Sequence, residues 1–161
     1  MSPNKIGLHI LNSYNGDLGQ PTVVKLVNVS PDYVRKGRER GGPKGLIGVR
    51  GWEKEQPLDN PTKRASEWFN KRLPQMQAMT DHGRDENVAF ESYNEIINEL
   101  AAAYTVFECT RLGLMHQHGL RSVVGNWGTG SPDEGAWVTY RSLIRDVRDT
   151  DFVGLHDYWA Y

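Results

Sequence analysis

The sequence predicts an α/β fold with a parallel sheet, and we expect a (β/α) barrel of the TIM type that has about six of its eight strands. Short apolar runs alternate along the chain with longer helical patterns. Continuous apolar runs suit strands that are buried on both faces, as in parallel sheets. Strand–helix alternation places the helices outside such a sheet. The runs cover residues 6–11, 22–27, 46–49, 88–93, 121–125 and 152–156.

Length and composition fit one globular domain. The chain has 161 residues, of which 38% are hydrophobic and 24% are charged. This is enough apolar side chain to bury a core, and the length matches one average domain. We therefore expect a single, partial barrel domain over residues 1–161.

The first long helix follows Asn60-Pro61, where a capping residue precedes a proline at the first helical position. Pro74 is expected to kink or split this helix. A short polar helix fits residues 30–40, before Gly41-Gly42-Pro43. The predicted buried face of the long helix consists of Ala65, Trp68, Phe69, Arg72, Met76 and Met79.

Two more helices lie in the second half of the chain. One is expected over residues 99–118 and ends at Gly119, with Leu100, Ala103, Tyr104, Phe107 and Leu114 on its buried side. The other begins at Ser131-Pro132-Asp133-Glu134, which has the pattern of a capping box. Its expected buried stripe is Trp137, Tyr140, Ile144 and Val147.

A doubly wound open sheet is the alternative to a barrel. Neither the dinucleotide-binding G-x-G-x-x-G nor the P-loop motif occurs. In a barrel the functional residues gather at the carboxyl ends of the strands. Here every predicted strand ends in a hydrogen-bonding side chain or a ring. These residues are His9, Asn12, Lys25, Asn28, Arg50, Trp52, Asn94, Glu95, Asn126, Trp127, His156, Tyr158 and Trp159.

Asn94-Glu95 at the end of the fourth run is the strongest candidate for chemistry. A carboxylate flanked by rings at a strand end can be desolvated, which suits a general acid near neutral pH. Such an acid protonates a glycosidic oxygen, and the neighbouring amide can bind a sugar hydroxyl. Without its context the dipeptide is more often structural. Asn98-Glu99 repeats it, and there a helix cap is the better interpretation.

The other strand-end residues have a structural interpretation beside the functional one. His156, Tyr158 and Trp159 are either sugar-binding residues or a packed aromatic cluster. The same two interpretations, functional and structural, apply to Asn126-Trp127. Lys25 lies inside an apolar run, so we expect an ion pair with Glu91. Arg50 either binds a substrate hydroxyl or holds Glu95, and His9 is a further candidate for substrate binding.

Several functional classes are not expected. Lys and Arg total 19 and Asp and Glu total 20, so the net charge is −1 and nucleic acid is not an expected partner. One cysteine, Cys109, excludes a disulfide framework, and no metal-ligand spacing occurs, so we expect neither a metal nor another cofactor. No apolar run could span a membrane. The N-terminus has no signal-peptide pattern, and a cytoplasmic location is the default expectation.

Four segments together resemble the retaining (β/α)8 glycoside hydrolases of clan A, especially the family-39-like and family-5-like members. The segments are residues 23–27 (VVKLV), 91–95 (ESYNE), 120–130 (LRSVVGNWGTG) and 154–158 (GLHDY). The resemblance covers most of the chain. It implies that Glu95 is the acid/base and that Asn94 binds the hydroxyl next to the reacting carbon. His9, Arg50, Asn126, Trp127, His156, Tyr158 and Trp159 would then contact a carbohydrate substrate.

The sequence also departs from this family. The resemblance implies a nucleophilic Glu on a seventh strand, whereas the chain stops at Tyr161, after the sixth. An open barrel would expose strand edges and apolar surface, so we expect a homo-oligomer or a partner that completes the barrel. A non-catalytic carbohydrate-binding or structural protein remains the alternative. An aldolase or sugar-phosphate lyase is a third possibility, for which Lys25 is the only sign.

Overall fold

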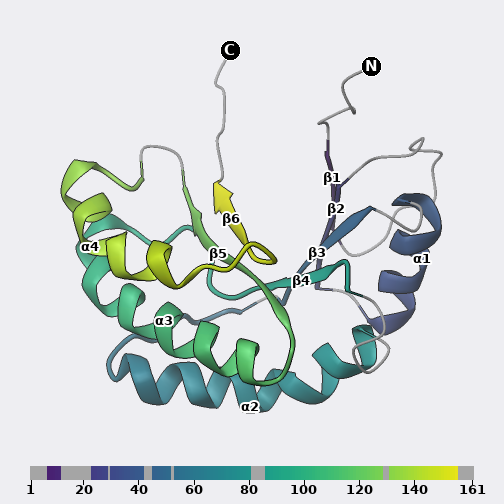
Figure 1. Cartoon of the computed structure of the whole chain (residues 1–161), viewed down its shortest axis with the longest axis horizontal. Helices are drawn as coiled ribbons and strands as arrows, with labels where there is room; N and C mark the ends of the chain where they lie inside the picture. Colours follow the sequence, from purple (N-terminus) through teal and green to yellow (C-terminus); the bar gives the residue numbers. More distant parts are fainter. Residues whose placement is uncertain are drawn as a thin grey trace. The chain divides into compact units, whose positions relative to one another are not determined.

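The protein is an α/β fold with parallel strands, as a computed structural model shows (Figure 1). The structure describes residues 7–11, 23–28, 30–41, 45–51, 53–80, 86–128 and 131–155. Two compact units divide the chain. The first consists of Met1–Trp52 and Leu73–Glu91, and the second of Glu53–Arg72 and Ser92–Tyr161.

The first unit contains four parallel strands in chain order, each hydrogen-bonded to the next. Val24, Ile47 and Val88 occupy equivalent register positions on three of them, and all three are buried. The strands begin and end within a few residues of the predicted apolar runs. They are β1 (Gly7–Leu11), β2 (Val23–Val27), β3 (Leu46–Arg50) and β4 (Val88–Glu91).

Helix α1 (Pro31–Gly41) connects β2 to β3 and confirms the predicted short polar helix. A glycine lies where this helix approaches the sheet. A Cβ atom on Gly37 would lie 3.2 Å from Cδ1 of Leu26 and 3.4 Å from Cδ1 of Ile47. The absence of a side chain therefore lets α1 pack directly on β2 and β3.

The predicted ion pair between Lys25 and Glu91 is confirmed. The Lys25 Nζ lies 2.9 Å from Glu91 Oε2, and the Glu91 side chain is 4% exposed. Lys25 is on β2 and Glu91 is on β4, with Gly48 of β3 between them. A Cβ atom at Gly48 would lie 3.8 Å from Glu91 Oε1, so the Glu91 carboxylate lies close to this residue of the middle strand.

The second unit contains two parallel strands that pair with each other, β5 (Arg121–Trp127) and β6 (Phe152–Leu155). It also contains helices α3 (Ala101–Gln117) and α4 (Glu134–Asp146). A short 3-10 helix, η1 (Asn98–Leu100), precedes α3. Figure 1 shows α3 lying along β5. Gly119, with φ of +66°, follows α3 as the sequence predicts.

Helix α2 (Pro61–Met79) runs through both units as one continuous helix. The Asn60 side chain accepts a hydrogen bond from the Lys63 backbone N–H, which confirms the predicted cap. Pro74 lies inside the helix but does not split it. The five apolar residues of the predicted buried face, Ala65, Trp68, Phe69, Met76 and Met79, are all buried, whereas its sixth residue, Arg72, is half-buried.

The predicted buried stripes of the last two helices are partly wrong. On α3 Tyr104 and Phe107 are buried as expected, but Leu100 is 41% exposed and precedes the helix. On α4 Tyr140 is buried, whereas Trp137 and Ile144 are 41% and 37% exposed. Apolar spacing alone cannot fix how a helix is rotated about its axis when apolar residues lie on two neighbouring faces. The residues that α4 buries are Ala136, Tyr140 and Leu143.

The start of α4 also differs from the predicted capping box. Asp133 is the N-cap, and its side chain accepts a hydrogen bond from the Ala136 N–H at 2.8 Å. The Ser131 hydroxyl instead donates to Asn98 Oδ1 at 2.8 Å. The predicted cap role of Asn98 is therefore wrong, because its side chain holds the loop before α4.

In the described ranges, no helix is both long enough and apolar enough to cross a membrane.

Candidate functional site

Glu95 lies at the carboxyl end of β5, although it follows β4 in the sequence. Its backbone N–H donates a 2.9 Å hydrogen bond to the carbonyl of Asn126. Its side chain lies against Gly128, where an added Cβ atom would be 3.3 Å from Glu95 Cγ. Glycine at this position therefore gives the Glu95 side chain its place beside the strand end. The structure thus brings Glu95 and Asn126, which the sequence places at two different strand ends, into one site within the second unit.

The residues just before Glu95 are held by the loop that precedes α2. The Gln56 side chain pairs with both backbone groups of Asn94: its oxygen accepts from the Asn94 N–H, and its Nε2 donates to the Asn94 carbonyl at 3.2 Å. This amide pairs with the backbone much as a neighbouring strand would.

Tyr93 adds a second attachment to the same loop. Its hydroxyl donates to the Pro57 carbonyl at 3.3 Å, and its ring stacks on Phe107 with the centroids 4.4 Å apart. Burial, helped by the negative charge of Glu53, raises the pKa of Tyr93 to about 12. Tyr93 is therefore a neutral hydrogen-bond donor over the physiological pH range.

Two residues of the site adopt a left-handed backbone conformation without being glycine. Glu95 has φ of +53° and Asn126 has φ of +49°. Asparagine tolerates this conformation, whereas for glutamate it is uncommon and unfavourable. Strain of this kind is often found where function fixes the residue type.

We expect Glu95→Asn to raise the free energy of unfolding by about 0.5–1 kcal/mol, because asparagine adopts positive φ at lower cost. Urea denaturation measures the change. Glu99→Asn is the matched control, since Glu99 is an exposed glutamate in a second Asn-Glu pair and does not have positive φ. A loss of stability at Glu95, or an equal gain at both positions, would contradict the assignment of strain.

Asn126 forms an irregularity at the end of β5. The β5–β6 register pairs Gly125 with Gly154 and Trp127 with Leu155, so Asn126 is the extra residue of a bulge. Its side chain lies over Gly154, where an added Cβ atom would be only 2.1 Å from Asn126 Oδ1. Gly154 therefore provides the space that the amide occupies.

The Asn126 amide is a buried polar group with unused hydrogen-bonding capacity. The residue is 1% exposed, and neither Oδ1 nor Nδ2 has a hydrogen-bond partner among the described residues. Burying an amide without partners is unfavourable by about 1–3 kcal/mol, so such groups call for a specific explanation. Hydrogen bonding to a ligand would satisfy this amide.

We expect Gly154→Ala to destabilise the protein by about 1–3 kcal/mol, because the new methyl group overlaps the Asn126 amide. Asn126→Gly removes the amide and keeps a residue that accepts positive φ, so adding it should recover most of the loss. Chemical denaturation of the two single variants and the double variant measures this coupling.

Gly113→Ala is the matched control, because a Cβ atom placed at Gly113 would have no described atom within 4 Å apart from its chain neighbours and the backbone of its own helix. It should leave stability unchanged or raise it slightly, since alanine is the better helix former. Additive effects of Gly154→Ala and Asn126→Gly would refute the overlap.

Trp127 does not occupy the open position that the sequence analysis expects. It is 0% exposed, and its ring packs against Trp137 and Tyr140, with centroids at 5.1 Å and 4.8 Å. A ring enclosed in this way cannot offer a face to a sugar. The reason is that β5 continues to Trp127. This residue therefore belongs to the strand and packs under α4, instead of lying beyond the strand end.

Two other predicted site residues, Arg50 and His9, belong to the first unit. Arg50 is buried at the end of β3 in the first unit, where its carbonyl accepts a hydrogen bond from the Asn28 N–H. His9 lies on β1, but its side chain is outside the described part. Five of the predicted strand-end residues lie entirely outside the described ranges: Asn12, Trp52, His156, Tyr158 and Trp159.

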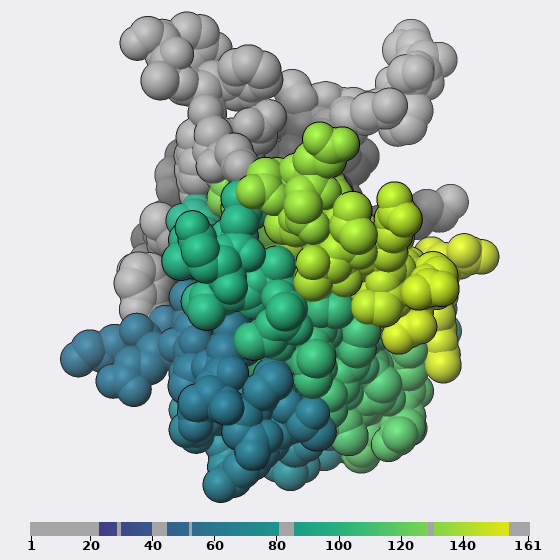
Figure 2. Space-filling model, turned by 90° about the vertical axis from the view of Figure 1, so that its left-hand side faces the viewer, coloured from purple at the N-terminus to yellow at the C-terminus, as the bar shows by residue number. Residues whose placement is uncertain are grey.

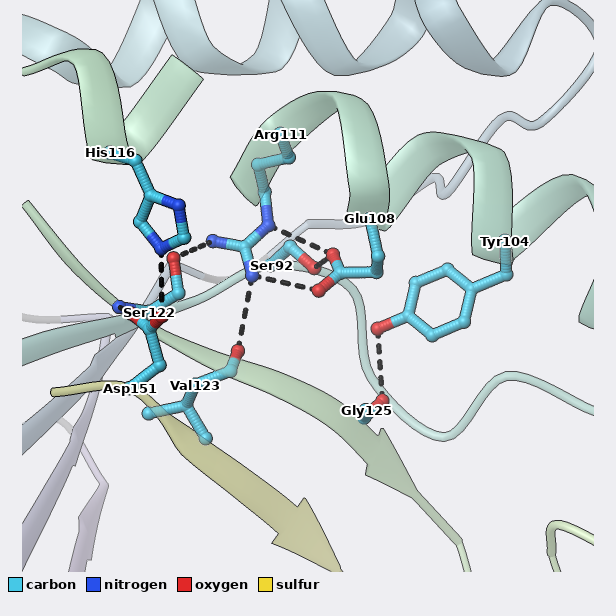
Figure 3. A network of polar contacts seen from close by, with 9 residues as sticks. All are labelled: Ser92, Tyr104, Glu108, Arg111, His116, Ser122, Val123, Gly125 and Asp151. Atoms are coloured by element: carbon cyan, nitrogen blue, oxygen red, sulfur yellow. Dashed lines mark hydrogen bonds and ion pairs between the residues drawn. The ribbon is translucent and has the colours of Figure 1, made fainter. Parts of the chain in front are cut away.

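A buried polar network between α3 and β5 is absent from the sequence predictions (Figure 3). Arg111 makes a two-point ion pair with Glu108, with N–O distances of 2.9 and 2.7 Å, and both side chains are 0% exposed. The Ser92 hydroxyl donates to the same carboxylate. Arg111 also donates to the Val123 carbonyl at 3.2 Å. Burial alone would lower the pKa of Arg111, but the charge of Glu108 overcomes this and raises it.

The network continues to Asp151, just before β6. One oxygen of this carboxylate accepts from the Ser122 N–H at 2.9 Å, and the other accepts from the Arg148 N–H at 3.0 Å. His116 Nε2 lies 2.7 Å from that second oxygen. His116 is therefore tied to the start of β6, although the sequence analysis gives it no specific role.

One sequence signal could have revealed this network. Glu108 and Arg111 are three residues apart and fall among the apolar residues that α3 buries. Charged residues at this spacing on a buried face must pair. Because α3 and β5 enclose the pair, its role is to hold the two elements together.

The described part of the chain contains no cluster of three or more His, Cys, Asp or Glu side chains that could hold a metal ion. Comparisons with protein-family models, with curated proteins and with solved structures find no match to this chain.

Proposed function

We propose that the chain is a glycoside hydrolase-like domain that acts on or binds a carbohydrate at the carboxyl end of β5, in the second unit. The proposal includes a barrel of the (β/α) type with about six of eight strands, as in the clan A enzymes that the sequence resembles. Parallel strands alternating with helices in both units support this fold. In this proposal Glu95 is the acid/base and Asn94 binds a sugar hydroxyl.

The observation that carries the proposal is the junction between Glu95 and Asn126. The backbone hydrogen bond from the Glu95 N–H to the Asn126 carbonyl joins two residues of which one carries a carboxylate and the other a buried side-chain amide with unsatisfied donors and acceptors. Sugar hydroxyl groups both donate and accept hydrogen bonds, so they suit an amide, which offers two donors and an acceptor. A carboxylate next to such a group can exchange a proton with a glycosidic oxygen.

A non-catalytic carbohydrate-binding protein is the second candidate, and the exposure of Glu95 favours it. A general acid that works near neutral pH usually lies in a desolvated setting. Glu95 is exposed in this structure, whereas the buried polar group of the site is the Asn126 amide. Binding through Asn126 and Asn94 requires no proton transfer.

A panel of aryl β-glycosides and the matching oligosaccharides tests both candidates. Azide is added as an external nucleophile, since a retaining mechanism needs a second group that attacks the sugar carbon. We expect slow, azide-dependent release of the aryl group, and, for aryl groups that are poor leaving groups, loss of this turnover in Glu95→Gln.

Oligosaccharide binding measured by calorimetry without turnover would favour the binding protein. If the protein shows no binding and no turnover across the panel, both candidates are refuted. Turnover that is independent of azide and survives Glu95→Ala would show that another mechanism operates.

A further inference from the structure

The peptide unit that joins Asn94 to Glu95 is held from both sides. Its carbonyl, which belongs to Asn94, accepts a hydrogen bond from Gln56 Nε2 at 3.2 Å. Its N–H, which belongs to Glu95, donates to the Asn126 carbonyl at 2.9 Å. This unit is trans, so its C=O and N–H groups point in opposite directions. Gln56 and Asn126 therefore flank it as two neighbouring strands flank the middle strand of a sheet.

Gln56 lies on a short segment that is attached to α2 at both of its ends. At the first end Glu53 accepts hydrogen bonds from Arg72, from Nε at 3.0 Å and from a terminal nitrogen at 2.5 Å. At the other end Asp59 accepts from Arg64 Nε at 2.7 Å. Figure 2 shows the blue chain at the start of α2 against the teal chain that follows β4. Gln56 therefore reaches the peptide unit from an anchored segment.

A flip of this peptide unit would relieve the strain at Glu95. Because the unit is planar, its orientation is set by ψ of Asn94 and φ of Glu95. Glu95 has φ of +53°, which is unfavourable for a residue with a Cβ atom. Turning the unit by about half a turn brings φ of Glu95 into the extended region, but it breaks the hydrogen bonds to Gln56 and Asn126 together. Each of the two bonds therefore opposes the relaxation of Glu95.

We propose that Gln56 is a positioning residue for the Glu95 site. By holding the Asn94 carbonyl, it keeps the peptide unit in the orientation that gives Glu95 its left-handed conformation and its hydrogen bond to β5. Gln56 thus acts through Asn94 and not by touching the ligand. Its effect on the Glu95 backbone is a property of the fold alone, whereas its effect on a carbohydrate ligand rests on the proposed function.

Hydrogen exchange of the backbone amides, measured by NMR on the whole chain, tests the effect on the backbone. Gln56→Met keeps a side chain of similar length but removes both hydrogen bonds. It should lower the protection of the Glu95 N–H by about fivefold or more, although this N–H bonds to Asn126. The Ser122 N–H, which bonds to the Asp151 carboxylate, should keep its protection. Unchanged protection at Glu95, or an equal loss at Ser122, would overturn the proposal.

Gln77→Met is the matched control, because Gln77 is an exposed glutamine of α2. It should leave the protection of the Glu95 N–H unchanged. Glu95→Asn supplies a second check, since asparagine has less strain to release. Adding Gln56→Met to Glu95→Asn should therefore lower the protection of that N–H less than Gln56→Met does alone. An equal loss in both backgrounds would show that Gln56 does not oppose strain at this position.

Gln56→Glu makes the contact depend on pH. An ionised carboxylate accepts from the Asn94 N–H but places a second acceptor against the Asn94 carbonyl, whereas the protonated group donates to that carbonyl. The protection of the Glu95 N–H, divided by the wild-type value at the same pH, should therefore fall by about fivefold or more between about pH 4 and pH 7. The division removes titrations that both proteins share, including those of Glu53 and Asp59. A ratio that is independent of pH would contradict the two-point contact.

The effect on the ligand is measured with the panel of glycosides and oligosaccharides. Gln56→Met should weaken oligosaccharide binding, or azide-dependent release of a phenyl group, by about fivefold or more, and Gln77→Met should change neither. Loss of Glu95 protection with unchanged binding and turnover would overturn the role of Gln56 at the site and leave the proposed function standing. The expected loss of protection in a protein that binds and cleaves no glycoside would confirm the backbone effect and refute the proposed function.

Discussion

Arg111→Met should destabilise the second unit by about 3–5 kcal/mol, which is a large part of the stability of an ordinary domain. The substitution keeps an apolar chain of similar length but removes the charge that faces Glu108. The Glu108 carboxylate is then left fully buried, and the hydrogen bond from the Ser92 hydroxyl is the remaining contact that Figure 3 draws to it. An uncompensated buried charge is far more unfavourable than a lost surface contact.

The double variant Glu108→Leu/Arg111→Met separates the loss of the ion pair from the unfavourable effect of leaving one buried charge unpaired. With both charges removed, an apolar pair occupies the space between α3 and β5, and most of the lost stability should return. Urea denaturation of the single and double variants measures this recovery. If Arg111→Met does not fold, Arg111→Lys serves in its place, because lysine keeps the charge but cannot make the two-point contact.

Arg64→Met provides the matched control. Arg64 also makes hydrogen bonds to two carboxylates, those of Asp59 and Glu67, but both of these partners are exposed. Water replaces those contacts when the arginine is removed, so the loss should be much smaller than at Arg111. Equal losses at Arg64 and Arg111 would show that burial of the ion pair does not determine its contribution.

Most of the secondary structure could be predicted because it depends on local sequence. The apolar runs predict the strands, and Asn60-Pro61 and Gly119 predict helix ends, since capping and positive φ restrict the residue type at those places. The Lys25–Glu91 pair could also be predicted, because a lysine within a buried strand needs a partner.

The rest depends on tertiary packing that one sequence does not reveal. The bulge at Asn126 moves Trp127 into the core, and an alternating or apolar pattern contains no sign of one inserted residue. The rotation of α4, which buries Tyr140 and leaves Trp137 half-exposed, depends on which of two apolar faces meets the rest of the second unit. The role of Gln56 is equally hidden, because it joins residues 38 positions apart.

If Glu95 is the acid of the proposed reaction, the effect of Glu95→Gln should depend on the leaving group. A phenyl glycoside has a poor leaving group, so its oxygen must gain a proton as the bond to the sugar breaks. A dinitrophenyl glycoside releases a stable anion and hardly needs that proton. With azide as the nucleophile, Glu95→Gln should therefore slow phenyl release by about 10²–10⁴-fold and leave dinitrophenyl release almost unchanged.

Glu99→Gln is the matched control for this experiment. It makes the same substitution in the second Asn-Glu pair, where the glutamate is exposed in η1. It should leave the rates with both substrates unchanged. The ratio of the two rates in each variant cancels differences in protein concentration and in the fraction of folded protein. An equal loss with both leaving groups would mean that Glu95 binds the sugar without donating a proton, because only proton donation distinguishes the two substrates.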